Sequence, residues 1–129
     1  MKQLPLIARV VVDVPSRALT EPFDYSVPAE LALVTRVGVP VVVPLGARRC
    51  VGYVVETSTH SAYDGRLRAI EAVVGEPVFD RRAIAIATWI ANEYLAPLSE
   101  SLRLFLPPGS APTARKASDG GWVVTGRQL

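Results

Sequence analysis

The sequence predicts a mostly β domain with helices at its C-terminal end, and three observations predict it. Residues 1–75 hold five short runs rich in β-branched and aromatic residues, with short turn-forming segments between them. The pattern changes at Asp80, where good helix formers follow a residue suited to capping a helix. Half of the 129 residues are hydrophobic, so the composition is sufficient for a core of ordinary size.

The five expected strands follow one another closely, in the runs Leu6–Val14, Pro22–Pro28, Val37–Pro44, Cys50–Ser58 and Arg66–Gly75. In the second run, PFDYSVP, alternation places two aromatic rings and a valine on one face and Asp24 and Ser26 on the other. Pro40 restricts part of the third run to an edge or a bulge, and Gly52 in the fourth indicates a bulge or a close backbone approach. The period of the fifth run fits a strand or a helix, and we expect a strand. Such short strands favour a small β-barrel-like (OB-like) domain or a curled sheet.

Two helices are expected to flank this barrel. The first follows Asp80, an acceptable N-cap, over the run DRRAIAIATWIANEYL, and Pro97 ends or bends it. The second is a short helical turn within Leu98–Leu106, before two consecutive prolines. The sequence therefore predicts a short helical pair after the strands.

Apolar residues surround most of the first helix. Ile86, Trp89 and Ile90 widen its apolar stripe almost all round, which predicts burial on more than one side. We interpret Trp89 and Tyr94 as helix packing, because aromatic side chains contribute large areas to protein cores. For the same reason we expect the two tyrosines of the second and fourth strands to face the core.

The barrel and helices make one expected domain over residues 1–106. Residues 107–121 are interpreted as a linker, because proline, glycine and serine dominate them. The run Trp122–Thr125 then begins a strand that has no evident partner before the chain ends at 129. We therefore expect a front piece of a longer protein that ends inside the next domain.

The distribution of charge along the sequence argues against a protein that binds long stretches of nucleic acid. The net charge is +2, but residues 1–106 hold eleven basic and eleven acidic side chains, with no basic stripe. The single cysteine, Cys50, excludes an internal disulfide and suits the cytosol, so we expect a cytoplasmic protein. The N-terminal apolar run is too short and too charged for a signal peptide or a membrane span.

No catalytic constellation is found in the sequence. It contains neither a GxxxxGK[ST] phosphate loop nor a GxGxxG motif. One histidine and one cysteine do not make a four-ligand metal site, and we interpret His60 as a surface loop residue and Cys50 as a small core residue. We expect no enzyme activity and no cofactor in this chain.

Seven short motifs occur in order between about residues 5 and 109: FDY, VVVPLG, GYVV, LRAIEAV, EPVF, WIANEYLAP and LFLPPG. Together they make the chain resemble the N-terminal 3′-end DNA-binding domain of the PriA family of primosomal replication-restart helicases. The resemblance implies a small barrel that holds the 3′ end of the nascent leading strand at stalled forks and D-loops. It also implies partners: other domains of the same protein, primosome proteins and single-strand-binding proteins, but no membrane. Longer family members carry an ATP- and Mg-dependent 3′→5′ DNA helicase motor and a zinc-bearing region. The resemblance further implies that residues 122–129 are the start of the winged-helix domain that follows in this family, and that the protein is nucleoid-associated.

The resemblance also implies which residues bind the DNA end. The family pocket carries over to Phe23, Asp24, Gly46 and Arg68, and Arg48 and Arg49 beside the turn are candidate phosphate contacts. Three positions depart from the family pattern. Leu45 stands where Phe is usual, Arg68 where Lys is usual, and Pro40 where Arg is common. An arginine keeps the charge of the lysine but presents a flat fork instead of a compact ammonium.

An acid in a DNA site has a physical explanation. An internal nucleotide has phosphates on both sides, which repel a carboxylate, whereas a 3′ terminus ends in a hydroxyl that donates a hydrogen bond. Asp24 is therefore suited to select a strand end, and Phe23 to stack on the terminal base. Because these two residues alternate along a strand, we predict a bulge or a strand end there.

Two other functions stay open. One is a protein-interaction module in which the wide apolar helix docks other primosome domains or partners. The other is a fragment of an enzyme whose active site lies further along a longer chain.

Overall fold

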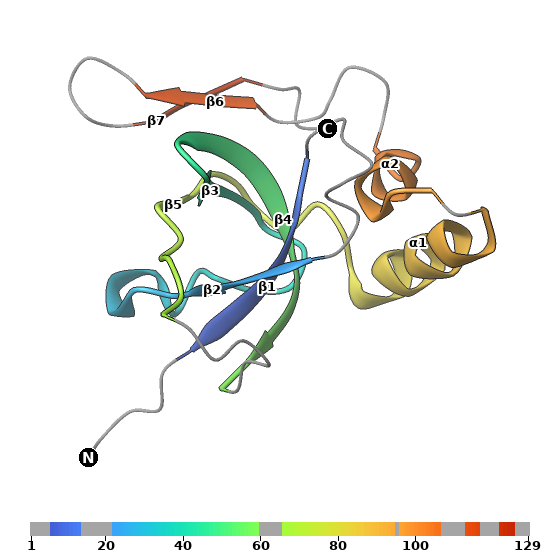
Figure 1. The fold of residues 1–129 in the computed structure, drawn as a ribbon, viewed down its shortest axis with the longest axis horizontal. Helices are drawn as coiled ribbons and strands as arrows, with labels where there is room; N and C mark the ends of the chain where they lie inside the picture. Colours follow the sequence, from blue (N-terminus) through green and yellow to red (C-terminus); the bar gives the residue numbers. More distant parts are fainter. Residues whose placement is uncertain are drawn as a thin grey trace.

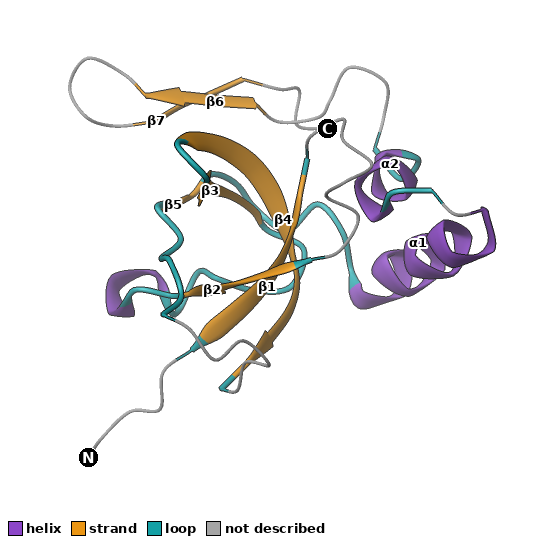
Figure 2. Cartoon of the chain, viewed as in Figure 1, coloured by secondary structure: helices purple, strands orange, loops and turns teal. Residues whose placement is uncertain are grey.

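The computed structural model describes residues 6–13, 22–59, 66–94 and 96–106, and the backbone of two further strands at 113–116 and 122–125. Five strands form one antiparallel sheet: β1 (Ile7–Val12), β2 (Phe23–Ser26), β3 (Pro40–Leu45), β4 (Arg48–Ser58) and β5 (Ala72–Val73). A 3₁₀ turn (Ala29–Leu31) follows β2, and the helices are α1 (Arg81–Tyr94) and α2 (Leu98–Arg103). The curled sheet and the helical pair beside it confirm the expected mostly β, OB-like class (Figures 1 and 2).

The sheet curls until its two ends meet. The strand order is β2-β1-β4-β3-β5, so β2 and β5 lie at opposite ends. Ser26 of β2 forms a parallel bridge with Ala69, in the segment that leads into β5. The Ser26 N–H donates to Arg68 O at 2.9 Å, and the Ile70 N–H donates to Ser26 O at 3.0 Å. We call this junction the seam; it closes the sheet into a small barrel.

The seam explains a correction to the fifth strand. We expected one strand over Arg66–Gly75, but only Ala72–Val73 joins the ladder. The segment changes partner as it passes along: it meets β2 around Ala69 and then β3, where the Glu71 N–H donates to Val42 O at 2.9 Å. A segment that crosses from one sheet end to the other does not run beside one partner long enough to form a long strand.

Packing at Gly52 confirms the expected close backbone approach. A Cβ atom at this position would lie 2.5 Å from Val10 Cγ1 and 2.8 Å from Val11 O, so a larger residue does not fit. Nearby, the β1–β4 register shifts between Arg9 and Val10, which leaves Val55 as an extra residue on β4. Inside the barrel, the core consists of Ala8, Val10, Val12, Tyr25, Val39, Val41, Val43, Val54 and Ile70.

The helices lie beside the barrel and close a second core. The Ala83 N–H donates to Asp80 Oδ1 at 2.8 Å, which confirms the expected N-cap. Ile84 and Ala87 of α1 pack in a cluster with Val11, Tyr53, Phe79 and Leu102. Arg103 of α2 contacts Asp13 Oδ1 with Nη2 at 2.7 Å, which ties α2 to the end of β1.

The outer side of α1 does not match the expectation of burial on more than one side. Ile86 is 43% exposed, Trp89 59% and Tyr94 74%. Helix packing of Trp89 and Tyr94 was therefore a wrong prediction, because α1 rests on the barrel and α2 through one face, and no described element covers the other. We call these three residues the outer face of α1.

The segment after the helices also differs from the expectation. Strand β6 (Thr113–Lys116) lies within the segment 107–121 that composition marked as a linker, and it pairs antiparallel with β7 (Trp122–Thr125). Thus β7 has a partner, and the composition of the flanking residues hid a short strand. A following winged-helix domain stays a prediction. No helix within the described ranges is both long and apolar enough to cross a membrane.

Candidate nucleic-acid interface

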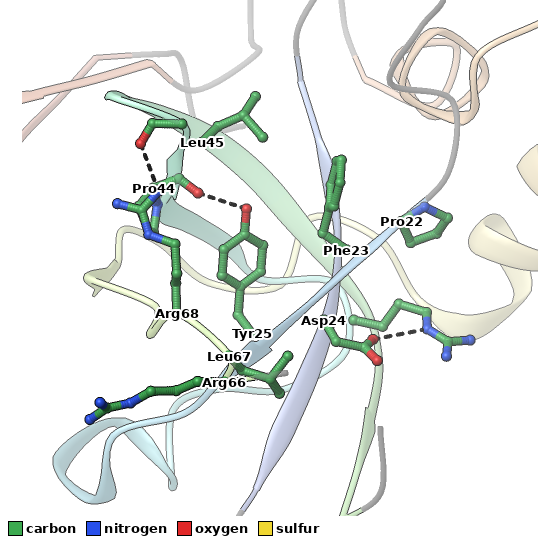
Figure 3. Close-up of a pocket in the computed structure, with 11 residues that line it drawn as sticks. Pro22, Phe23, Asp24, Tyr25, Pro44, Leu45, Arg66, Leu67 and Arg68 are labelled. Carbon is green, nitrogen blue, oxygen red and sulfur yellow. Dashed lines mark hydrogen bonds and ion pairs between the residues drawn. The ribbon is translucent and has the colours of Figure 1, made fainter. Parts of the chain in front are cut away.

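A cavity of about 710 Å³ opens at the seam of the barrel. Three segments meet there: the start of β2, the β3–β4 turn and residues 66–68. Its described lining consists of Arg9, Pro22, Phe23, Asp24, Tyr25, Pro44, Leu45, Gly46, Arg66, Leu67 and Arg68 (Figure 3). The fold therefore brings together Phe23, Asp24, Gly46 and Arg68, which are separated by up to 45 positions in the chain.

Phe23 and Asp24 line this cavity from the first two positions of β2. The β1–β2 register is regular, so no bulge interrupts this ladder, and the predicted strand end is what the structure has. Phe23 and Tyr25 point to the same side of β2, whereas the Asp24 carboxylate turns away from Tyr25 and Arg68 (Figure 3). Asp24 thus lies on a different wall of the cavity from the β3–β4 turn and Arg68.

Asp24 is held at this wall by a neighbouring cation. Its side chain is only 11% exposed, and Arg9 Nε donates to Asp24 Oδ1 at 3.3 Å. Arg9 and Asp24 are direct partners in the β1–β2 register, and Arg9 Nη1 also lies 3.5 Å from Glu56 Oε2. Arg9 is therefore a site residue that the sequence reasoning missed. Its place on the polar face of the first strand was readable, but the register that pairs it with Asp24 was not.

Gly46 and Arg68 contact each other across the seam. Gly46 begins the two-residue turn between β3 and β4 with φ +61°, a conformation that glycine adopts without strain. A Cβ at Gly46 would meet nothing within 4 Å, so open space lies over the turn. Arg68 Nη1 donates to Gly46 O at 2.6 Å, which uses one of the five guanidinium N–H donors.

Tyr25 forms the floor of the cavity. It is 4% exposed, and its hydroxyl donates to Pro44 O at 2.8 Å, linking β2 to β3 (Figure 3). Burial raises the pKa of Tyr25 to about 12; the nearby Cys50 thiol adds to the rise, and the Arg68 guanidinium opposes it. The expectation that Tyr25 faces the core is confirmed, and the same ring also supports the site.

Arg48 and Arg49 do not occur among the described residues that line the cavity. Arg49 Nε lies 2.6 Å from Glu71 Oε2, so its charge is paired beside the turn, and Arg48 is exposed to solvent. Arg66 lines the cavity instead, although the sequence reasoning did not select it. Among the described residues the lining holds three arginines and one aspartate, an excess of positive charge that suits a nucleotide.

No cluster of three or more metal-ligating side chains occurs in the described parts of the chain. A small closed barrel with an aromatic and cationic cavity at its rim is instead the architecture of a module that binds single-stranded nucleic acid.

Comparison with known proteins identifies the particular family. Residues 9–107 match the family described as the 3′ DNA-binding domain (3′BD) of PriA, and the chain belongs to this family. The replication restart protein PriA of Bacillus subtilis (strain 168) is 28% identical over 102 residues, which are 78% of this chain and 13% of that protein. PriA of Treponema pallidum (strain Nichols) is 35% identical over 104 residues, 76% of this chain and 15% of that protein. The chain thus spans only about a seventh of the length of these relatives.

Proposed function

We propose that this 3′ DNA-binding domain holds the terminal nucleotide of a DNA strand in the seam cavity, with Asp24 accepting a hydrogen bond from the 3′-hydroxyl. The observation that carries the proposal is a carboxylate only 11% exposed in a cavity whose other charged residues, among those the structure describes, are arginines. A site for an internal nucleotide would gain nothing from that carboxylate, because phosphates flank both sides of such a nucleotide.

The carboxylate gives end selectivity in two ways. A hydrogen bond from the 3′-hydroxyl to a charged acceptor contributes about 1.5–3 kcal/mol. A 3′-phosphate or a continuing strand would instead place negative charge beside Asp24. Arg9, whose Nε lies 3.3 Å from Asp24 Oδ1, holds the carboxylate in place.

The other predicted residues divide the remaining contacts. Phe23 stacks on the terminal base, which contributes about 1–3 kcal/mol with little dependence on sequence. The open space over Gly46 admits the edge of the base close to the backbone. Arg68 contacts the terminal nucleotide from the opposite wall with the donors not used by Gly46 O, and Arg66 adds positive charge at the same rim.

The test compares oligonucleotides that end in a 3′-hydroxyl or a 3′-phosphate. We expect the unaltered chain to prefer the hydroxyl by about tenfold to a hundredfold. In Asp24→Asn the preference falls to about threefold or less, because a neutral amide neither gives the charge-assisted bond nor repels phosphate. Glu76→Gln is the matched control. Glu76, like Asp24, pairs with an arginine, because its Oε2 lies 3.5 Å from Arg36 Nη2, but it does not line the cavity. Equal affinity of the unaltered chain for both ends would refute the proposal.

The relatives are named replication restart proteins, and these names support a proposal for the role of a longer protein. We propose that end capture recruits such a protein to free 3′ ends at stalled forks and D-loops in the cytoplasm. Its helicase motor with ATP and Mg, its zinc, and its primosome and single-strand-binding partners stay predictions.

The exposed outer face of α1 favours a second, compatible function as a docking module. Trp89→Ala is expected to leave DNA-end affinity unchanged and to weaken binding to a separately purified remainder of the longer protein. Unchanged binding to that remainder would remove this second function.

A further inference from the structure

We propose that a second cavity receives the base of the nucleotide immediately 5′ to the strand end. It has a volume of about 530 Å³ and lies between α1, the start of α2 and the strands β1 and β4. Arg9 and Pro22 line both this cavity and the seam cavity. The inference rests on the proposed function, because it extends the DNA strand from the seam cavity across this shared wall.

Arg9 is suited to the phosphate that joins the two nucleotides. Its guanidinium lies between Asp24 of the first cavity, at 3.3 Å, and Glu56 of the second, at 3.5 Å. Its side chain is 44% exposed, so solvent-facing N–H donors remain for a ligand. A linking phosphate occupies the position between two adjacent sugars. A strand with one base in each cavity therefore places that phosphate at the shared wall.

The chemistry of the second cavity matches a nucleobase, which has apolar faces and a polar edge. Aliphatic side chains make its apolar walls, among them Val55, Ile84 and Leu98. Asn92 and Glu56 supply polar groups beside Arg9 and Thr88. The Asn92 amide offers donors and an acceptor, and within the described residues it makes no hydrogen bond to protein. Amide and carboxylate groups of this kind pair with base edges.

An abasic nucleotide isolates this contact. The probe is a single-stranded oligodeoxynucleotide ending in a 3′-hydroxyl, with the penultimate base present or absent. The unaltered chain is expected to bind the intact strand at least about fivefold more tightly, because an abasic strand leaves the apolar walls of the second cavity unfilled. The preference for 3′-hydroxyl over 3′-phosphate is measured in parallel and reports on the first cavity alone.

Filling the second cavity provides the matching variants. Ala91→Leu adds bulk to its wall and is expected to abolish the abasic effect while the 3′-hydroxyl preference remains. Ala85→Leu is the control, because Ala85 is exposed on the same helix and lies outside the described lining. Asn92→Ala, at an exposed position where folding is not at risk, is expected to reduce the abasic effect by about twofold.

The outcomes separate the two proposals. If the unaltered chain keeps its 3′-hydroxyl preference but binds intact and abasic strands equally, the second site is refuted and the proposed function stands. If Ala91→Leu and Asn92→Ala both retain the full abasic effect, the penultimate base binds elsewhere and the second site is also refuted. If the 3′-hydroxyl preference itself is absent, both proposals are refuted together.

Discussion

Two buried tyrosines offer a matched test of what a hydroxyl contributes to this barrel. Tyr25 is 4% exposed and Tyr53 0%. The Tyr25 hydroxyl donates to Pro44 O at 2.8 Å, whereas the buried Tyr53 hydroxyl has no hydrogen-bond partner within the described residues. Replacing each tyrosine by phenylalanine removes a hydroxyl oxygen that is hydrogen-bonded in one case and unpartnered among the described residues in the other. We therefore expect Tyr25→Phe to lower the free energy of unfolding, and Tyr53→Phe to leave it unchanged or to raise it slightly.

The structure sets the size of each change. Tyr25→Phe removes a buried hydrogen bond and leaves the Pro44 carbonyl oxygen without that donor, which costs about 1–3 kcal/mol. Tyr53→Phe removes a hydroxyl that is already unpaired, so we expect a change of about zero or a gain of up to about 1 kcal/mol. The ring of Tyr53 still meets Phe79 edge-on, with centroids 5.0 Å apart, after the change.

Urea denaturation followed by circular dichroism measures the difference. With a denaturant slope of about 1–3 kcal/mol per molar, the two midpoints should differ by about 1 M. Equal losses in both variants, or a larger loss in Tyr53→Phe, would show that the hydrogen bond across the barrel does not stabilise it as argued.

Three further outcomes follow from local geometry. Asp80→Ala removes the bond to the Ala83 N–H and is expected to destabilise the chain by about 1 kcal/mol in the same urea experiment, whereas Asp80→Ser is expected to retain most of it. Gly46→Ala places a side chain at φ +61° without a clash and is expected to cost about 1 kcal/mol, with Gly46→Asn less costly; equal stability of all three chains would argue against strain. Because burial raises the pKa of Tyr25 to about 12, this group stabilises the fold fully below about pH 10, and that contribution is lost as the pH rises toward 12. The alkaline fall in unfolding free energy should be shallower in Tyr25→Phe.

Local patterns were sufficient to predict much of this fold. Alternation found the first four strands, and the Asp80 cap and Pro97 bounded the helices, because these signals lie within a few neighbouring residues. The fifth strand was overextended because the segment's partners at Ser26 and Val42 are distant in sequence. The exposure of Trp89 was missed because hydrophobicity does not state what covers a helix face.

The site was predictable in part for the same reason. Motif resemblance selected Phe23, Asp24, Gly46 and Arg68, and all four line one cavity, although their roles in binding DNA stay predictions. Arg9 was not selected, because only the strand register reveals that it faces Asp24. Residue types were thus readable from the sequence, whereas cross-strand pairing was not.

The seam joins β2 to residues 68–70 through two backbone hydrogen bonds around Ser26, and residues on both sides of the seam line the seam cavity. A ligand bound in this cavity contacts both sides of the seam and is bound only while the seam is closed. Binding therefore shifts the equilibrium away from local opening of the barrel. Amide protons of Ser26 and Ile70 should exchange more slowly in the occupied state. Substitutions that weaken or strengthen the seam should consequently change the affinity for a ligand, even when every side chain that contacts the ligand is unchanged.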